Sequence, residues 1–128
     1  MGKYLYDHGD GRFKHRWNQP LAGFVPSVRG EVGKCSSKIT QQAAQTLLDD
    51  GVEYRDDPAD RHPEKIFNVF DGVPYEATHT LKGVSYHGYP WRGRMPRRIL
   101  RELERRAEAN GHAREFRNWI NRYAETNR

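Results

Sequence analysis

The sequence is poor in cysteine and in long apolar segments. Its single cysteine, Cys35, has no partner for an intramolecular disulfide, which is typical of proteins in a reducing compartment. No run of apolar residues approaches the length that spans a bilayer, and the N-terminal segment contains no apolar stretch of the kind found in signal peptides. We therefore expect a cytoplasmic protein that makes no contact with a membrane.

The sequence also lacks the spacings by which proteins hold metal ions. A chain with one cysteine has no CxxC pair, and no two histidines are spaced as in HxxxH. Apart from the histidine at position 87, the histidines are scattered along the chain: His8, His15, His62, His79 and His112. We predict neither a bound metal ion nor a cofactor.

Hydrophobic residues are scarce, at 35% of the chain, and the mean hydropathy is −1.04. Such values are low for a globular protein, but aromatic residues make up 12% of the chain. Because each aromatic ring supplies a large apolar area, this content argues against disorder. At 128 residues the chain fits a single domain, residues 1–128, with one core built mainly from aromatic and aliphatic side chains.

Lysine is absent from the last third of the chain. Residues 91–128 contain 11 arginines, 5 glutamates and no lysine, a net charge of +6, whereas residues 1–90 have a net charge of −1. Arginine offers planar, bidentate contact to phosphate and stacks on rings, although a bias in codon usage would produce the same composition. The segment 49–64 has the opposite sign, with seven acidic residues against two arginines.

The first half of the chain is predicted to contain a β-hairpin and one helix. Residues 4–6 and 12–17 are aromatic runs on either side of an Asp- and Gly-rich turn, which favours an N-terminal hairpin. Residues 18–34 contain two prolines and three glycines and are expected to be mostly loop, with a short strand at Phe24–Val25. A helix capped by Ser37 or Thr40 is expected to run through Asp50, with residues 56–63 as a polar loop.

The second half is predicted to form a three-stranded antiparallel meander over residues 65–90. The Asp71-Gly72 dipeptide is a strong hairpin signal between residues 66–70 and 73–78, and a turn around Lys82-Gly83 leads to a third strand, 84–90. Two helices follow, one beginning at Pro96 and ending near Gly111, the other over residues 113–124. The order of elements predicts an α+β protein.

Two-residue turns would fix which side chains share a face of this meander, because side chains alternate along a strand. One face is expected to hold Ile66, Phe70, Val73, Tyr75, Ala77, Val84 and Tyr86. The helices are expected to pack on this face, and the second C-terminal helix is expected to bury Phe116, Trp119, Ile120 and Tyr123 against it. The opposite face is expected to be open to solvent and to hold Lys65, Phe67, Val69, Glu76, Thr78, Ser85, His87 and Tyr89.

Glu76 and His87 lie close together in this register, and a carboxylate near an imidazole makes a usable acid–base pair. Cleavage of RNA without a metal needs a base for the ribose 2′-hydroxyl, an acid for the leaving oxygen and a cation for the phosphorane. His87, Glu76 and Lys65 are therefore candidate catalytic residues of a small ribonuclease of the toxin or effector type. An ordinary cross-strand contact on a solvated sheet face would leave the same pattern.

Aromatic rings and arginines alternate just after the meander, as in proteins that stack bases and bind phosphates. The candidate nucleic-acid-binding residues are Tyr89, Trp91, Arg92, Arg94, Arg98 and Arg101. We therefore predict a nucleic-acid-binding domain, with RNA favoured over DNA. A metal-independent ribonuclease, and a protein-interaction or regulatory domain, are the alternatives, and an acidic protein surface is the alternative partner. The sequence leaves the oligomeric state open.

Overall fold

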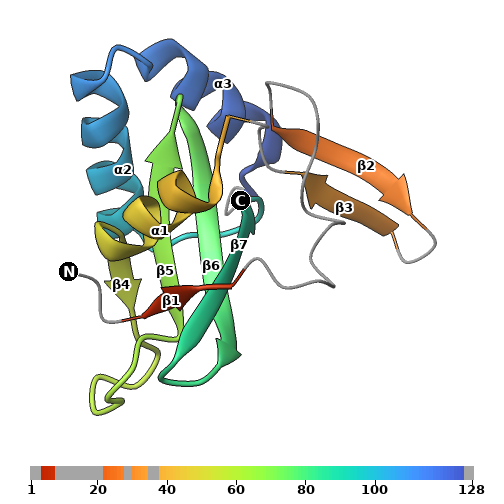
Figure 1. The fold of residues 1–128 in the computed structure, drawn as a ribbon. Helices are drawn as coiled ribbons and strands as arrows, with labels where there is room; N and C mark the ends of the chain where they lie inside the picture. The colour runs from red at the N-terminus through yellow and green to blue at the C-terminus, as the bar shows by residue number, and fades with distance from the viewer. Residues whose placement is uncertain (1–3, 8–21, 28–29, 35–37, 126–128) are drawn as a thin grey trace.

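Seven strands and three helices form the part of the chain that the computed structural model describes, residues 4–7, 22–27, 30–34 and 38–125 (Figure 1). The strands are β1 (Leu5–Tyr6), β2 (Gly23–Ser27), β3 (Gly30–Lys34), β4 (Val52–Tyr54), β5 (Lys65–Phe70), β6 (Val73–Leu81) and β7 (Ser85–Pro90). The helices are α1 (Gln41–Asp49), α2 (Arg97–Ala109) and α3 (Ala113–Tyr123). Within the described residues, no helix is long and apolar enough to cross a membrane.

The main sheet has five strands in the order β1-β7-β6-β5-β4. Its centre is the predicted antiparallel meander β5-β6-β7, so the α+β class and the meander are confirmed. The prediction of only three strands is wrong, because β4 extends one edge antiparallel to β5 and β1 extends the other edge parallel to β7. Neither short strand has an alternating pattern long enough to be recognised in the sequence.

The predicted register of the meander is confirmed. Ile66 pairs with Ala77 across the first hairpin, and Thr78 pairs with His87 across the second. The second turn has one residue more than predicted, since Leu81 pairs with Ser85, but β6 also contains one extra residue between His79 and Leu81. This bulge offsets the longer turn, and the alternation of faces along β6 and β7 is therefore the predicted one.

Helices cover both faces of the sheet, which corrects the predicted packing. Phe116 and Trp119 of α3 and Leu103 of α2 pack on the face of Phe67 and Val69, the face that was expected to be open. The opposite face is covered by α1, whose Leu48 packs with a cluster of Ile66, Ala77, Tyr86 and Tyr4. Because β5 is apolar on both faces, it can be buried on both.

Residues 5–6 were predicted to form one arm of an N-terminal hairpin. They form β1 instead, which pairs in parallel with β7. The other arm of the predicted hairpin, residues 12–17, lies outside the described residues. The short strand expected at Phe24–Val25 is confirmed as part of β2, but residues 30–34 form a second strand, β3, rather than loop. Phe24 anchors this two-stranded sheet through ring contacts with Trp119 and Tyr123 of α3.

The ends of α1 follow from its flanking residues. Thr40 is the N-cap, as predicted, and its side-chain oxygen accepts a hydrogen bond of 3.1 Å from the Ala43 amide. Gly51 follows the C-cap Asp50, and a β-carbon at this position would overlap the side chain of Ile66 on β5. Glycine therefore lets the chain turn tightly from α1 into β4 against the central strands.

Tyr86 is the most deeply buried tyrosine of the face that α1 covers, with 0% of its surface exposed. Its hydroxyl donates a hydrogen bond to the carbonyl oxygen of Pro63, and its ring meets that of Tyr4 edge to face at 5.0 Å. Burial raises the pKa of Tyr86 to about 12, and the charges of Tyr4 and Glu53 add to the rise. The cluster joins β1, β7 and the loop before β5 into one packed unit.

This burial predicts a loss of stability in alkali that depends on Tyr86. The Tyr86 phenol has a pKa near 10.0 in the unfolded chain and about 12 in the folded chain. The neutral phenol therefore stabilises the fold fully below pH 10.0, and this contribution is lost progressively as the pH rises toward 12. The slope for one such group approaches about 1.4 kcal/mol per pH unit. Urea unfolding between pH 8 and pH 11 should show a shallower decline for Tyr86→Phe than for the wild type. Tyr123→Phe, at the end of α3, should retain the wild-type decline, and equal slopes for all three proteins would contradict the prediction.

Candidate functional site

The first turns of α2 carry three exposed arginines, Arg97, Arg98 and Arg101. None of the three forms an ion pair with a carboxylate of a described residue. Arg97 and Arg101 are four positions apart and Arg98 and Arg101 three, so like charges face one another on the helix surface. The three arginines thus lie at neighbouring positions on the helix surface without an ion pair to a carboxylate of the described residues.

The second half of α2 is different, because its arginines form ion pairs within the protein. Glu102 accepts from the guanidinium nitrogens of Arg105 at 2.6 Å and of Arg106 at 2.8 Å. These two hydrogen bonds lower the pKa of Glu102 to about 2. Arg106 also donates to the backbone oxygen of Asp50 at 2.7 Å and so ties α2 to the end of α1. The excess positive charge of the helix therefore lies at its N-terminal end.

Positive charge is unfavourable at that end of a helix. The aligned peptide dipoles place a partial positive charge at the N-terminus, where acidic residues are the stabilising choice. The first turn of α2 contains no acidic residue, and its N-cap, Pro96, makes no side-chain capping bond. The arginines therefore weaken the helix that carries them, and a bound anion would offset both the dipole and the mutual repulsion.

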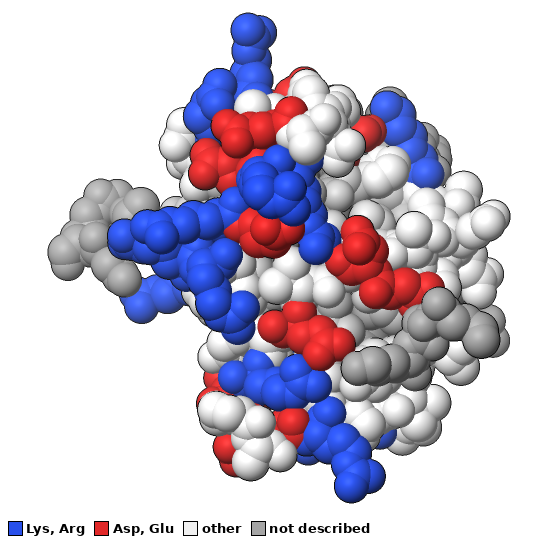
Figure 2. Space-filling view, turned by 90° about the vertical axis from the view of Figure 1, so that its left-hand side faces the viewer, with Lys and Arg blue, Asp and Glu red and all other residues white. Residues whose placement is uncertain are grey.

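Two more candidate residues, Arg92 and Arg94, lie in the segment between β7 and α2. The guanidinium of Arg92 lies over the Phe24 ring at 4.6 Å, and Arg94 pairs with Glu125 across 3.4 Å, with both side chains well exposed. Figure 2 shows the side of the molecule that carries α2 and β4. Lys and Arg side chains crowd together on one part of this surface, with Asp and Glu side chains beside them.

Trp91, a predicted stacking residue, is not on this surface. Only 2% of the residue is exposed, and it packs in the core with Phe67, Leu103 and Trp119. Its indole nitrogen donates to the carbonyl oxygen of Arg94 at 3.0 Å, while its own carbonyl accepts from the indole nitrogen of Trp119 at 2.7 Å. Trp91 is therefore a core residue that fixes the start of the arginine segment, and it presents no ring face to a base.

The candidate catalytic residues share one face of the meander, as the confirmed register requires, since Glu76 pairs with Tyr89 and Thr78 pairs with His87. Glu76 is 8% exposed and accepts from the ammonium of Lys65 at 3.1 Å. The Tyr89 hydroxyl is hydrogen-bonded to Glu76 and to Thr78. Burial and the charge of Glu76 hold the pKa of Tyr89 well above its usual range, so this phenol is a hydrogen-bond donor throughout the physiological range.

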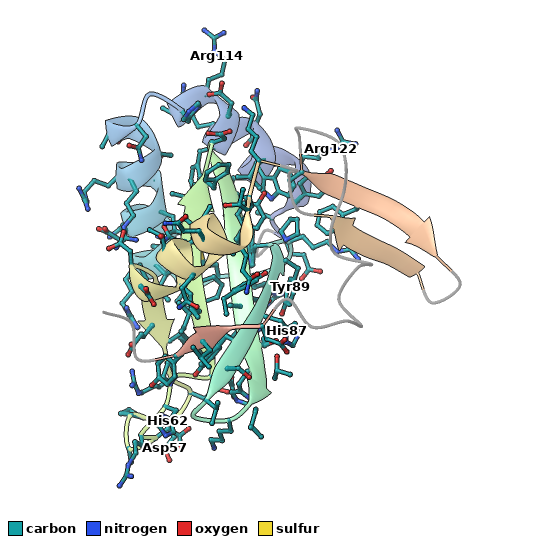
Figure 3. The ribbon with its side chains drawn as sticks, in the orientation of Figure 1. Asp57, His62, His87, Tyr89, Arg114 and Arg122 are labelled. Atoms are coloured by element: carbon teal, nitrogen blue, oxygen red, sulfur yellow. The ribbon has the colours of Figure 1, made fainter. Side chains whose placement is uncertain are left out.

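His87 continues this line of polar groups toward solvent. Its Nε2 lies 3.4 Å from the Thr78 hydroxyl and its Nδ1 lies 2.8 Å from the Thr80 hydroxyl. Figure 3 labels His87 and Tyr89 side by side on β7. When the Thr78 hydroxyl donates its proton to Tyr89, the Thr78 oxygen accepts a hydrogen bond from the Nε2–H of His87. The Thr80 hydroxyl then donates to Nδ1 of His87. The result is a hydrogen-bonded chain from His87 through Thr78 and Tyr89 to the Glu76–Lys65 pair.

This chain changes the acid–base hypothesis. A buried carboxylate that already accepts from Lys65 and Tyr89 is poorly placed to take a proton from a ribose hydroxyl directly. It can instead orient the groups between itself and His87, which is half-buried near the exposed Thr80. In this arrangement His87 is the group that would meet a substrate, and Glu76, Tyr89 and Thr78 would position it.

A pocket that the sequence did not predict lies beside the start of α2, and we call it the edge pocket. It has a volume of about 540 Å³ and is bounded by β4, β5, the segment before α2 and the end of α3. Its lining includes Tyr54, Asp56, Glu64, Lys65, Phe67, Trp91, Arg94, Met95 and Leu100. The acidic segment 49–64 was the only sequence signal for it, and that signal did not show which carboxylates meet.

Tyr54, Asp56 and Glu64 form one hydrogen-bonded group at the edge pocket. The Tyr54 hydroxyl donates to Asp56, and the Asp56 and Glu64 carboxyl groups are hydrogen-bonded to each other. The interaction with Asp56 raises the pKa of Glu64, whereas the hydrogen bond from Tyr54 and the interaction with Glu64 lower the pKa of Asp56. Arg55 braces the loop, because its Nε donates to the Asp60 carbonyl at 2.9 Å.

Comparison of the chain with family models, with curated proteins and with solved structures finds no match. Within the described residues, no group of three or more histidine, cysteine or acidic side chains is arranged to hold a metal ion.

Proposed function

We propose that this protein binds nucleic acid through the arginines at the start of α2. The observation that carries the proposal is the contrast within one helix: Arg105 and Arg106 form ion pairs, whereas Arg97, Arg98 and Arg101 have no carboxylate partner among the described residues. A row of phosphates supplies the missing counter-charge, and guanidinium groups bind phosphate oxygens in bidentate fashion. The favourable dipole at the helix N-terminus adds to the attraction.

RNA is the favoured nucleic acid, and a single strand the favoured form. Proteins that read single-stranded RNA take up unstacked bases beside the phosphate contacts, and the edge pocket lies next to these arginines, lined by Arg94 and the first residues of the α2 segment. Of the two predicted stacking residues, Tyr89 retains part of its surface exposed while Trp91 does not. Base contacts are therefore assigned to the pocket and to Tyr89.

Salt dependence tests this proposal. Single-stranded RNA oligonucleotides should be retained at low salt in the presence of EDTA, and log affinity should fall with log salt with a slope of about −2, since each of three phosphate contacts on a single strand contributes about −0.7. Fluorescence anisotropy from 50 to 300 mM salt measures the slope directly. An absence of retention at the lowest salt would contradict nucleic-acid binding and leave an acidic protein surface as the partner.

Metal-independent cleavage of the bound RNA is a second candidate function, favoured by the hydrogen-bonded chain from His87 to Glu76. We infer that His87 would act as the proton-transfer group and Lys65 as the nearest cation, 3.1 Å from Glu76. The same EDTA samples, run on a denaturing gel, test for cleavage. A nuclease would lose its activity in His87→Ala while retaining RNA, whereas intact RNA with the wild type would leave the binding function alone.

A further inference from the structure

We propose that the edge pocket binds an unpaired guanine base of the RNA held by the α2 arginines. This inference rests on the proposed function and deepens it by naming the base that is recognised. It uses three features of the described residues: an apolar floor, a wall of hydrogen-bond acceptors and a cationic rim. Each feature matches a different part of a guanosine nucleotide, the ring, its Watson–Crick edge and its phosphate.

The floor is apolar and fixed in place. Phe67 and Trp91 are each 2% exposed and belong to the core, so the atoms that they show to the pocket are held by packing beneath it. Met95 and Leu100, both half-buried, complete the apolar surface at the start of α2. A flat ring laid on such a surface buries apolar area on one side, and the polarisable Met95 thioether is a favourable neighbour for an aromatic ring. The volume of about 540 Å³ accommodates a nucleoside rather than a base alone.

The acceptor wall selects the base. Asp56 and Glu64 come from the two ends of the loop between β4 and β5, and the Glu64 amide donates to the Tyr54 carbonyl at 2.8 Å, which holds the two ends together. Ionised carboxylates only accept hydrogen bonds. Guanine is the one RNA base whose Watson–Crick edge offers two adjacent donors, N1–H and the 2-amino group; adenine, cytosine and uracil each place an acceptor beside a donor. Guanine would thus be favoured over the other bases by hydrogen bonds that they cannot complete.

The proximity of the two carboxyl groups supports this choice. The interaction with Asp56 raises the pKa of Glu64, because two bare charges side by side are unfavourable. The two N–H donors of guanine would offset the repulsion between these carboxylates. Lys65 and Asp60 are the other charged groups that act on Glu64, and Lys65 is itself held by Glu76.

The rim connects the pocket to the arginines of α2. Arg94 lines the pocket, and the charge of Arg98 acts on the Tyr54 hydroxyl at the acceptor wall. A nucleotide whose base lies over the apolar floor of the pocket, against Met95 and Leu100, can therefore direct its phosphate toward Arg94 and Arg98. The strand would continue along Arg97 and Arg101, so that base recognition and phosphate binding use one continuous surface.

The test compares three single-stranded oligoadenylates that carry one central guanosine, inosine or adenosine. We expect the wild type to bind the guanosine RNA at least about fivefold more tightly than the adenosine RNA, because one well-made pair of base contacts discriminates by about that factor or more. Inosine, which lacks the 2-amino group, should fall between them. Glu64→Gln, which replaces an acceptor oxygen by a donor, should bring the ratio close to one without abolishing binding to the adenosine RNA.

The controls separate failure of this inference from failure of the proposed function. Glu108→Gln makes the same change of charge at an exposed position of α2 outside the pocket and should preserve the guanosine preference. Asp56→Asn is the second pocket variant, for use if Glu64→Gln does not fold. Tight but equal binding of all three RNAs would overturn the guanine pocket and retain RNA binding. Titration with guanosine 5′-monophosphate and adenosine 5′-monophosphate, followed by tryptophan fluorescence, tests the pocket without RNA, and equal responses to the two would also overturn it.

Discussion

Replacing Arg97, Arg98 and Arg101 together with glutamate should lower the affinity for single-stranded RNA by at least about 100-fold at 100 mM salt. The change removes three cations that have no carboxylate partner among the described residues and puts three anions in their place. The fold should be preserved, because all three side chains are exposed. Thermal stability should be unchanged or increased, since acidic residues at a helix N-terminus interact favourably with the helix dipole.

A second triple variant on α3 provides the matched control. Arg114, Arg117 and Arg122 are exposed, and their replacement with glutamate changes the net charge by the same amount. In Figure 3, Arg114 points away from the sheet at the N-terminal end of α3. If the site lies on α2, the α3 variant should lose much less affinity than the α2 variant. Equal losses would show that binding depends only on net charge, and an α2 variant with wild-type affinity would contradict the proposed interface.

The centre of the fold could be predicted because its signals are local. Asp71 and Gly72 both have positive φ, 51° and 81°, which suits the turn chemistry of this dipeptide and fixes the register of β5 against β6. The face that each side chain occupies follows from alternation once the register is known. The bulge near His79 and the longer turn cancel, so an error in the turn length left the predicted faces intact.

Which face each helix covers could not be predicted, because the sequence of β5 permits either choice. Ile66 and Phe70 lie on one face and Phe67 and Val69 on the other, and the structure packs helices against both. Alternation separates a buried face from a solvated one only where one face is polar. The edge strands β1 and β4 were missed for a related reason, since both have three residues or fewer and depend on partners distant in the sequence.

The candidate site, like the fold, was predictable only where its sequence signals are local. The arginines of α2 could be found from composition, and their helical spacing from the periodicity of the segment. The edge pocket could not, because Tyr54, Asp56 and Glu64 meet Met95 and Leu100 only through the pairing of β4 with β5 and the crossing of the chain into α2. Trp91 was predicted to stack on a base because aromatic rings and arginines alternate in this segment, but it lies just after β7 where the chain enters the core.

Trp91→Ala should therefore act on stability and not on base stacking. The side chain is 2% exposed among Phe67, Leu103 and Trp119, and its removal creates a cavity at the junction of the sheet with α2 and α3. Truncation of a buried tryptophan costs about 3–5 kcal/mol, a large part of the roughly 5–15 kcal/mol by which a domain of this kind is stable. The lost bond to the Arg94 carbonyl adds a further unsatisfied acceptor.

Urea unfolding followed by circular dichroism measures this loss of stability. Leu81→Ala is the control, because Leu81 is 61% exposed. Its truncation should change the free energy of unfolding by no more than about 0.5 kcal/mol. A Trp91→Ala protein with wild-type stability and weakened RNA binding would show that the indole is a surface stacking group after all. We expect Trp91→Ala to lower the stability. The fraction of the variant that remains folded should show the wild-type salt slope of RNA binding, because the α2 arginines do not need the indole to reach a phosphate.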